Sequence, residues 1–278
     1  MTPPTTFQVP NGHVMVTTHG IIQAETYRCL TEARSFTERQ GLLNLRWGTI
    51  PGALVDKARN DACRGMLADS GAHWLIFVDG DMTVPNDTVV KLLQTAYHTH
   101  DWADVVGAYC NLRGDVAIPT IDTGTGTWES HYPNSGVKEV IRTGAACLLV
   151  KRHVCERIPQ PWFATRVPMR VIDAFAEIDN FARIKMDGTN PLRDHPAWSV
   201  LERIAVQDPS SIPGQFVPAE VGEDSGFCDR VRHAGMRIVV NTDIITGHLN
   251  QEVINWETHR DAMRDRQLDQ RYLVGLLH

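Results

Sequence analysis

The chain has 278 residues, of which 42% are hydrophobic and 22% charged, and its formal net charge is −6. This composition is typical of a globular protein with one large α/β domain or two small ones, and it excludes a disordered chain. The negative net charge disfavours wholesale wrapping of nucleic acid, and no apolar run approaches the ~20 residues that a membrane-spanning helix needs.

The first 80 residues alternate between strand-like and helix-like patterns. Strands are predicted at residues 14–18, 42–47 and 74–78, and helices at residues 25–39 and 51–67. This alternation predicts a parallel sheet whose strands are joined by crossover helices. Only one glycine, Gly20, follows the first strand closely, which disfavours a dinucleotide-binding or Walker-type phosphate loop.

The third strand ends on two carboxylates, Asp79 and Asp81, which are separated by Gly80. Open α/β sheets bind ligands at the carboxyl ends of their strands. Two neighbouring carboxylates repel each other unless a cation lies between them, so we expect a divalent metal that carries a phosphorylated ligand. The alternative is a plain turn whose aspartates cap the next helix.

The middle of the chain is less regular. A helix is predicted at residues 85–96, a strand at 104–109, and a buried segment up to residue 150 that begins after a turn at Thr143 and Gly144. Gly144 would either let the backbone approach a ligand closely or form a simple bend. Residues 158–221 are rich in proline and aromatic residues, which favours a segment that sets substrate specificity or a structural insert.

Near its end the chain has a second pair of carboxylates. Glu223 and Asp224 open a predicted helix that ends at Gly235, and they are followed by a strand at residues 238–240. A short apolar run then ends on Gly247 and His248. Residues 252–277 are predicted to form a helix. The carboxylates could be simple helix caps, and His248 could be an ordinary core histidine.

The order Asp79-x-Asp81, Gly144, Glu223-Asp224 and Gly247-His248 resembles that of family-2-like GT-A glycosyltransferases. The helix at residues 58–62 is similar to a segment before the Asp-x-Asp strand of these enzymes. The resemblance covers about residues 14–250. It implies one GT-A domain at residues 1–250, with a Rossmann-like, mostly parallel sheet flanked by helices. It also implies a loop-rich acceptor-side segment at residues 158–221 and a C-terminal helical extension at residues 251–278.

The resemblance also implies the reaction, which is transfer of a sugar from a nucleotide-diphosphate sugar, with UDP favoured, to an acceptor hydroxyl. Asp79 would lie near the ribose and donor sugar, and Asp81 and His248, together with Asp79, would bind Mn²⁺ or Mg²⁺. Asp224 is the candidate base of an inverting reaction, and Glu223 would orient hydroxyl groups. A retaining reaction stays open, because retaining members of the fold also use a late histidine.

The residues that would bind the nucleotide and the acceptor are less clearly indicated by the sequence. Candidate nucleotide contacts are Thr17, His19, Arg59 and Gly144. Residues 46–49 stand where many members carry an acidic residue after the second strand that reads uracil, so the base stays open. The basic run at residues 138–170 and the aromatic residues after it would suit either a hydroxymethylated DNA base or a glycan as the acceptor.

Other functions remain possible. Residues 77–83 also resemble the motif of haloacid-dehalogenase-like phosphatases, in which Asp79 would be the nucleophile. A non-catalytic nucleotide- or metal-binding module is a further alternative. Because the six cysteines are scattered and the first residues do not resemble a signal peptide, we expect reduced, mostly buried thiols. We expect the protein in the cytoplasm of a bacterium or, if a phage encodes it, of the host.

Overall fold

The computed structural model describes residues 8–18, 20–43, 45–52, 54–111, 119–124, 133–164, 166–170, 216–220 and 222–249. The chain divides into two compact units, Met1–His248 and Leu249–His278. The predicted helix at residues 252–277 lies outside the described residues, and the extension at residues 251–278 therefore stays a prediction.

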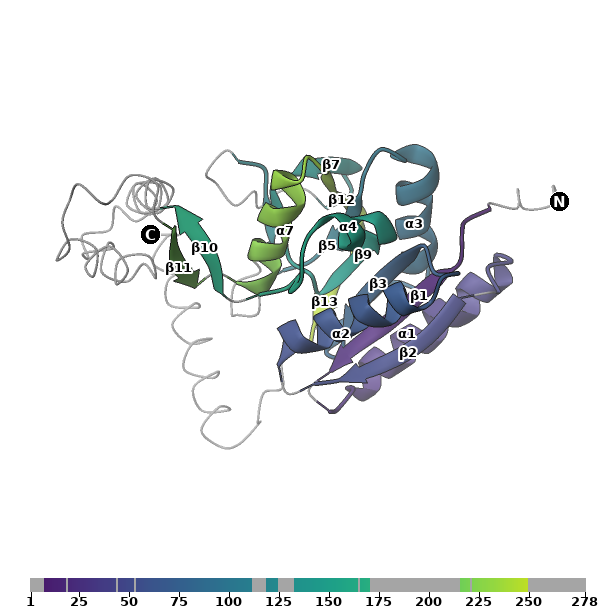
Figure 1. Ribbon diagram of the computed structural model, residues 1–278. Coiled ribbons are helices and arrows are strands. Elements are labelled where there is room, and N and C mark those ends of the chain that lie inside the picture. Colours follow the sequence, from purple (N-terminus) through teal and green to yellow (C-terminus); the bar gives the residue numbers. More distant parts are fainter. Residues whose placement is uncertain are drawn as a thin grey trace, which may run out of the picture. The chain divides into compact units, whose positions relative to one another are not determined.

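The first unit contains a seven-stranded sheet with the strand order β2-β1-β3-β9-β5-β12-β7 (Figure 1). Its strands are β1 Gly12–Thr18, β2 Leu45–Pro51, β3 Trp74–Asp79, β5 Val105–Tyr109, β7 Val137–Val140, β9 Cys147–Lys151 and β12 Ile238–Ile245. Strand β1 is parallel to β2 and β3, and β12 is parallel to β5. Strand β9 is antiparallel to β3 and β5, and β7 is antiparallel to β12. The predicted α/β class with a mostly parallel sheet is thus confirmed.

Helices cover both faces of this sheet (Figure 1). They are α1 Ala24–Arg39, α2 Val55–Ala68, α3 Thr88–Gln94 with a π-helical turn at Thr95–Thr99, α4 Arg152–Arg157 and α7 Glu223–His233. Because side chains alternate along a strand, Ile76 of β3 packs in a core cluster with residues of α1 and α3. Its neighbour Phe77 packs in a second cluster with residues of α2, α4 and α7. Asp79, two residues after Phe77, therefore lies on the face of β3 that α2, α4 and α7 cover, and its carboxylate contacts Arg59 of α2.

The predicted bounds of the second strand were wrong. The structure places β2 at Leu45–Pro51, so the strand runs through Gly48 instead of ending there. Gly48 pairs with Met15 of β1, and the sulfur atom of Met15 fills the space that a side chain would need. An edge strand can hold a glycine in extended form where a neighbour covers it. Residues 46–49 therefore lie inside β2, and the position compared with a uracil-reading acid is not at the strand end.

Two further differences concern the last third of the described chain. The predicted strand at residues 238–240 and the apolar run after it are one strand, β12, with an irregularity between Asn241 and Ile245. The segment at residues 158–221, predicted without regular structure, contains two antiparallel strands, β10 Arg166–Arg170 and β11 Phe216–Glu220. Residues 171–215 lie outside the described ranges.

The cysteines behave as the sequence predicts, because all six are free thiols and all are buried. Within the described ranges, no helix combines the length and the hydropathy that crossing a membrane requires.

Candidate functional site

The carboxyl ends of β1 and β3 lie side by side, because the two strands are parallel neighbours and Thr17 pairs with Asp79. The hydroxyl of Thr17 donates a hydrogen bond of 2.5 Å to Oδ1 of Asp79. At the next residue, a Cβ atom on Gly80 would come within 3.1 Å of the side chain of Thr18. The glycine between the two aspartates therefore lets the turn pack closely against the end of β1.

A buried arginine joins the two acidic motifs of the sequence. Arg59 of α2 is only 3% exposed, and its Nη2 donates to both carboxylate oxygens of Asp79, at 3.1 and 2.9 Å. Its Nη1 donates to Oε1 of Glu223 at 2.7 Å. A buried charge is stable only when it is paired and hydrogen-bonded, so Arg59 depends on both carboxylates. Burial lowers the pKa of the guanidinium, but the charges of Asp79, Glu223 and Asp224 outweigh it and raise this pKa.

Asp224 follows Glu223 in the first turn of α7, where a helix was predicted. Burial raises the pKa of its carboxyl group, and the negative charge of Glu223 raises it further. The backbone N–H of Ser225 and the charge of Arg59 act in the opposite direction. Its Oδ1 accepts a hydrogen bond of 2.7 Å from that N–H. A carboxylate with a raised pKa is a stronger proton acceptor, which is what a general base requires.

The late histidine lies beside the Asp-x-Asp turn. Strand β13, Gly247–His248, pairs with β4, Met82–Thr83, so that His248 lies opposite Met82, the residue after Asp81. The Nδ1 atom of His248 lies 2.6 Å from the backbone oxygen of Asn111. A carbonyl oxygen only accepts, so Nδ1 carries the hydrogen and, in the neutral ring, Nε2 has the lone pair that can bind a metal.

The predicted metal ligands do not form a complete metal site by themselves in the described part of the chain. Within the described ranges, no group of three or more His, Cys, Asp or Glu side chains is arranged to hold a metal ion. Asp79 accepts hydrogen bonds from Arg59 and Thr17 on its carboxylate oxygens. The role of Asp81, His248 and Asp79 as metal ligands therefore stays a prediction. A small protein set can serve Mg²⁺ or Mn²⁺, because these ions commonly take their other ligands from substrate phosphates and water.

Two predicted residues are not brought into this arrangement by a described contact. The N–H of Gly144 donates to the backbone oxygen of Thr120 at 3.2 Å, and a Cβ atom there would lie 2.9 Å from the hydroxyl of Thr120. Gly144 thus permits a close approach, but of the chain to itself, and its contact with a nucleotide stays a prediction. His19 lies outside the described residues.

Three of the basic residues at 138–170 are paired within the part of the fold that the structure describes. Lys151 is 8% exposed and donates to the backbone oxygen of Asp101 at 2.7 Å. Arg142 forms two hydrogen bonds of 2.8 Å with Asp229 of α7. Arg152 donates to four backbone oxygens near the end of α2. These three charges stabilise the fold, which weakens the case for a nucleic-acid surface here.

Sequence reasoning missed a contact next to Arg59. The side chain of Asn60 forms hydrogen bonds with both backbone polar groups of Phe163, whose ring lies under the guanidinium of Arg59. Asn60 belongs to the helical segment that carried part of the resemblance. No local pattern indicates its partner, because the two residues are far apart in the chain.

No family model matches the chain, and no curated protein is similar to it in sequence. Among solved structures, A197 from STIV is 15% identical over 86% of each chain, with a TM-score of 0.49. The fragment 1–349 of S. aureus TarS is 13% identical over 54% of this chain and 51% of that one, with a TM-score of 0.33. The same fragment in complex with UDP-GlcNAc gives a TM-score of 0.34 at 12% identity, over 53% of this chain and 48% of that one. The chain thus spans about half of the TarS fragment, and the roles of the site residues rest on the geometry above.

Proposed function

We propose that this chain is a glycosyltransferase that moves a sugar from a nucleotide-diphosphate sugar, UDP-linked by first choice, to an acceptor hydroxyl. One observation carries the proposal. Buried Arg59 joins Asp79, at the carboxyl end of β3, to Glu223, at the start of α7. Two acidic motifs that are distant in sequence therefore form one site at the edge of the sheet where α/β proteins bind ligands.

The second acidic motif supplies the base. In the proposed reaction Asp224 takes the proton of the acceptor hydroxyl while that oxygen forms a bond to the anomeric carbon of the donor. The bond between this carbon and the diphosphate oxygen breaks, and the diphosphate leaves with the electron pair, so the configuration inverts. Glu223 is held by Arg59 and orients hydroxyl groups. Because burial raises the pKa of Asp224, its carboxylate accepts a proton more readily than an exposed aspartate does.

The first acidic motif binds the donor. Thr17 and Arg59 fix the orientation of Asp79 before any ligand is present, which lowers the entropy cost of contacting the ribose and sugar. Asp81 and His248 would hold Mn²⁺ or Mg²⁺, and such an ion, when bound, supplies Lewis-acid stabilisation of the leaving diphosphate. Thr17, His19, Arg59 and Gly144 remain the proposed nucleotide contacts.

The phosphatase alternative is less well supported. A phosphatase nucleophile would need a carboxylate oxygen of Asp79 to attack phosphorus in line. Here both oxygens accept hydrogen bonds from Arg59, and one of them also from Thr17. For the acceptor, the internal pairing of Lys151, Arg152 and Arg142 removes part of the support for DNA. We therefore propose a glycan first, and a hydroxymethylated DNA base second.

Ligand binding and turnover test this proposal. The full chain is heated with UDP-, GDP- and CDP-sugars, each with Mn²⁺ and with EDTA, and donor consumption is then measured with glycan and hydroxymethylated-DNA acceptors. We expect metal-dependent stabilisation by one nucleotide class, absent in Asp81→Ala and retained in the control Asp101→Asn, whose side chain is on the surface. Stabilisation without turnover of any donor would favour a binding module. The absence of any response would contradict the transferase, and a screen of phosphate esters would follow.

A further inference from the structure

We infer that Asn60 is a positioning residue, which acts on the candidate site by holding Phe163 under the guanidinium of Arg59. The contact between the Asn60 side chain and the backbone of Phe163 is called the Asn60–Phe163 clasp below. The effect on catalysis rests on the proposed function, whereas the effect on Arg59 rests on geometry alone.

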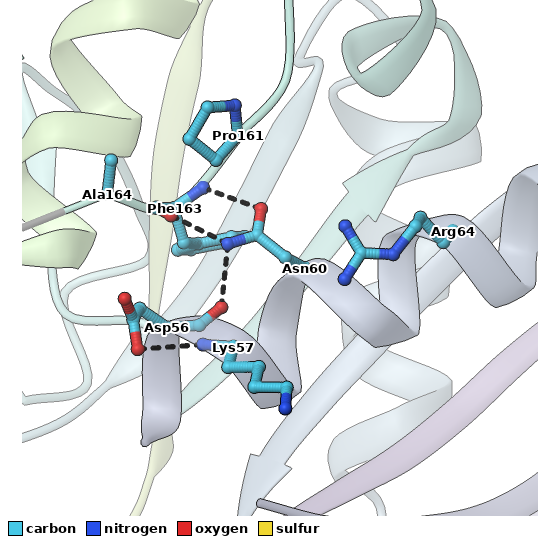
Figure 2. A pocket seen from close by; sticks show the side chains of 7 residues that line it. All are labelled: Asp56, Lys57, Asn60, Arg64, Pro161, Phe163 and Ala164. Atoms are coloured by element: carbon cyan, nitrogen blue, oxygen red, sulfur yellow. Dashed lines mark hydrogen bonds between the residues drawn. The ribbon is translucent and has the colours of Figure 1, made fainter.

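The clasp uses the hydrogen-bonding groups of the asparagine side chain almost completely. Its Oδ1 accepts from the N–H of Phe163 at 3.1 Å, and its Nδ2 donates to the backbone oxygen of Phe163 at 2.7 Å (Figure 2). Nδ2 also donates to the backbone oxygen of Asp56 at 2.8 Å. Asn60 is 6% exposed, so water cannot easily replace these partners. An aspartate here would place a carboxylate against two carbonyl oxygens.

The ring of Phe163 connects the same elements as the ion pairs of Arg59. It stacks on Phe227 of α7, with ring centres 4.3 Å apart and planes 13° apart. It meets Phe77 of β3 edge-on at 5.4 Å. The guanidinium carbon of Arg59 lies 5.7 Å from the centre of the same ring. The ring thus touches β3 and α7, which carry the two carboxylates that Arg59 binds.

Arg59 needs this support because its hydrogen bonds are incomplete. Its Nε atom is buried and has no hydrogen-bond partner among the described residues. The position of the guanidinium is therefore set by two ion pairs at one end and by the aromatic ring beside it. A shift of Phe163 would let the guanidinium move away from Asp79 or Glu223, and a misplacement of such a group is sufficient to slow an enzyme strongly.

A pocket of about 390 Å³ borders the clasp (Figure 2). It is lined by Asp56, Lys57, Asn60, Arg64, Pro161, Phe163 and Ala164. Loss of the clasp would open this wall of the pocket toward Arg59. Exchange of the buried Nε–H of Arg59 with solvent hydrogen therefore reports whether the clasp holds.

The test follows that exchange by NMR in the full chain, together with donor affinity and kcat. Asn60→Ala removes the clasp. The matched control is Asn241→Ala. Asn241 is a buried asparagine of β12, and its side chain donates a hydrogen bond of 2.9 Å to Thr95. We expect the Arg59 Nε–H to exchange about tenfold faster or more in Asn60→Ala, the factor for loss of one or two net hydrogen bonds, and to be unchanged in Asn241→Ala. We also expect kcat of Asn60→Ala to fall by on the order of 10²-fold, and the donor nucleotide to bind more weakly because Arg59 is a proposed nucleotide contact.

A second variant keeps the test decisive if Asn60→Ala does not fold. Phe163→Leu keeps the backbone hydrogen bonds of the clasp but removes the ring, and it is expected to accelerate the same exchange. Unchanged exchange of the Arg59 Nε–H in a folded Asn60→Ala or Phe163→Leu protein overturns the inference. If the wild-type chain neither binds nor uses any nucleotide sugar, the proposed function fails, and the exchange measurement still decides the role of the clasp.

Discussion

Two arginines lie near opposite ends of helix α2. Arg59 lies near its start and Arg152 contacts its end, and most of their hydrogen-bond partners differ in chemical kind. Arg59, near the start of α2, is 3% exposed and pairs with the carboxylates of Asp79 and Glu223. Arg152, from α4, has a side chain that is 23% exposed; it donates to four neutral backbone oxygens around the end of α2 and pairs with the half-exposed carboxylate of Glu156. Arg59 instead joins two mostly buried carboxylates that are distant in sequence.

The difference separates a structural arginine from one at the candidate functional site. Carbonyl oxygens at a helix end need donors wherever they occur, so the contacts of Arg152 are explained by the fold alone. Carboxylates at the carboxyl ends of parallel strands do not need to face one another for the sheet to form. The cluster of carboxylates around Arg59 places charged groups where a phosphorylated ligand and a cation can bind.

The largest expected contrast is between two aspartates of α7. Asp224→Asn removes the proposed base and is expected to lower kcat by about 10²- to 10⁴-fold, the usual contribution of general-base catalysis. Asp229→Asn removes the partner of Arg142 instead and should leave kcat close to that of the wild type. Initial rates with saturating donor measure both. Equal losses in the two variants would show that α7 has only a structural role.

The next contrast compares the two arginines directly. Arg59→Met leaves two partly buried carboxylates without their cation, and it is expected to lower the free energy of unfolding by about 3 kcal/mol and to abolish transfer. Arg152→Met leaves helix-end carbonyls without a donor, and we expect a loss of about 2 kcal/mol with transfer retained. Urea unfolding at one pH and a rate assay of the surviving fold measure both. Retained transfer in Arg59→Met would remove the distinction.

The pH dependence of stability should also differ between Asp224, at the candidate site, and Asp69, just after α2. The pKa of Asp224 is raised above its usual 3.8, first by burial, so its contribution to stability is present below that value and is lost as pH rises through the folded pKa. The pKa of Asp69 is lowered, first by the hydrogen bond from His13, so its contribution is present above 3.8 and is lost as pH falls through the folded pKa. Unfolding free energies of Asp224→Asn and Asp69→Asn across acidic pH should therefore deviate from the wild type in opposite directions. Deviations of the same sign would contradict these environments.

The smallest expected effect concerns the basic run. Arg142→Gln removes a half-exposed pair with Asp229 and is expected to lower the free energy of unfolding by about 1 kcal/mol or less. If the pair is purely structural, the affinity of the protein for double-stranded DNA at low salt is the same with and without the substitution. A clear drop in DNA affinity, steep in salt, would restore the nucleic-acid acceptor.

Much of this site could be predicted because its signals are local. The apolar run before Asp79 predicted β3, and the carboxylates before a helical pattern predicted the start of α7. The bounds of β2 were wrong because a glycine reads as a strand end in sequence, although Met15 on the neighbouring strand covers Gly48 in the fold. A glycine in a sequence can therefore mark a strand end or lie inside a strand, depending on whether a neighbouring side chain covers it.

What could not be predicted depends on distant partners. Arg59 was a candidate for contacting the nucleotide, but no pattern in α2 indicates that it pairs with both Asp79 and Glu223. The partner of Asn60 lies in a segment without periodicity, and the pairing of β13 with β4 joins two-residue strands that carry no strand signal. In each case the local sequence gives the residue type and its position on a helix or strand, whereas the order of the strands in the sheet decides which distant residue it contacts.

A crystal of the full chain grown with UDP and Mn²⁺, measured at the manganese absorption edge, tests the central claim most directly. The account predicts one anomalous peak in contact with Asp81 and His248, with the diphosphate bound to it and the nucleoside lying toward Asp79 and Thr17. A nucleotide bound elsewhere, or a manganese peak away from the carboxyl ends of β1 and β3, would contradict the transferase site.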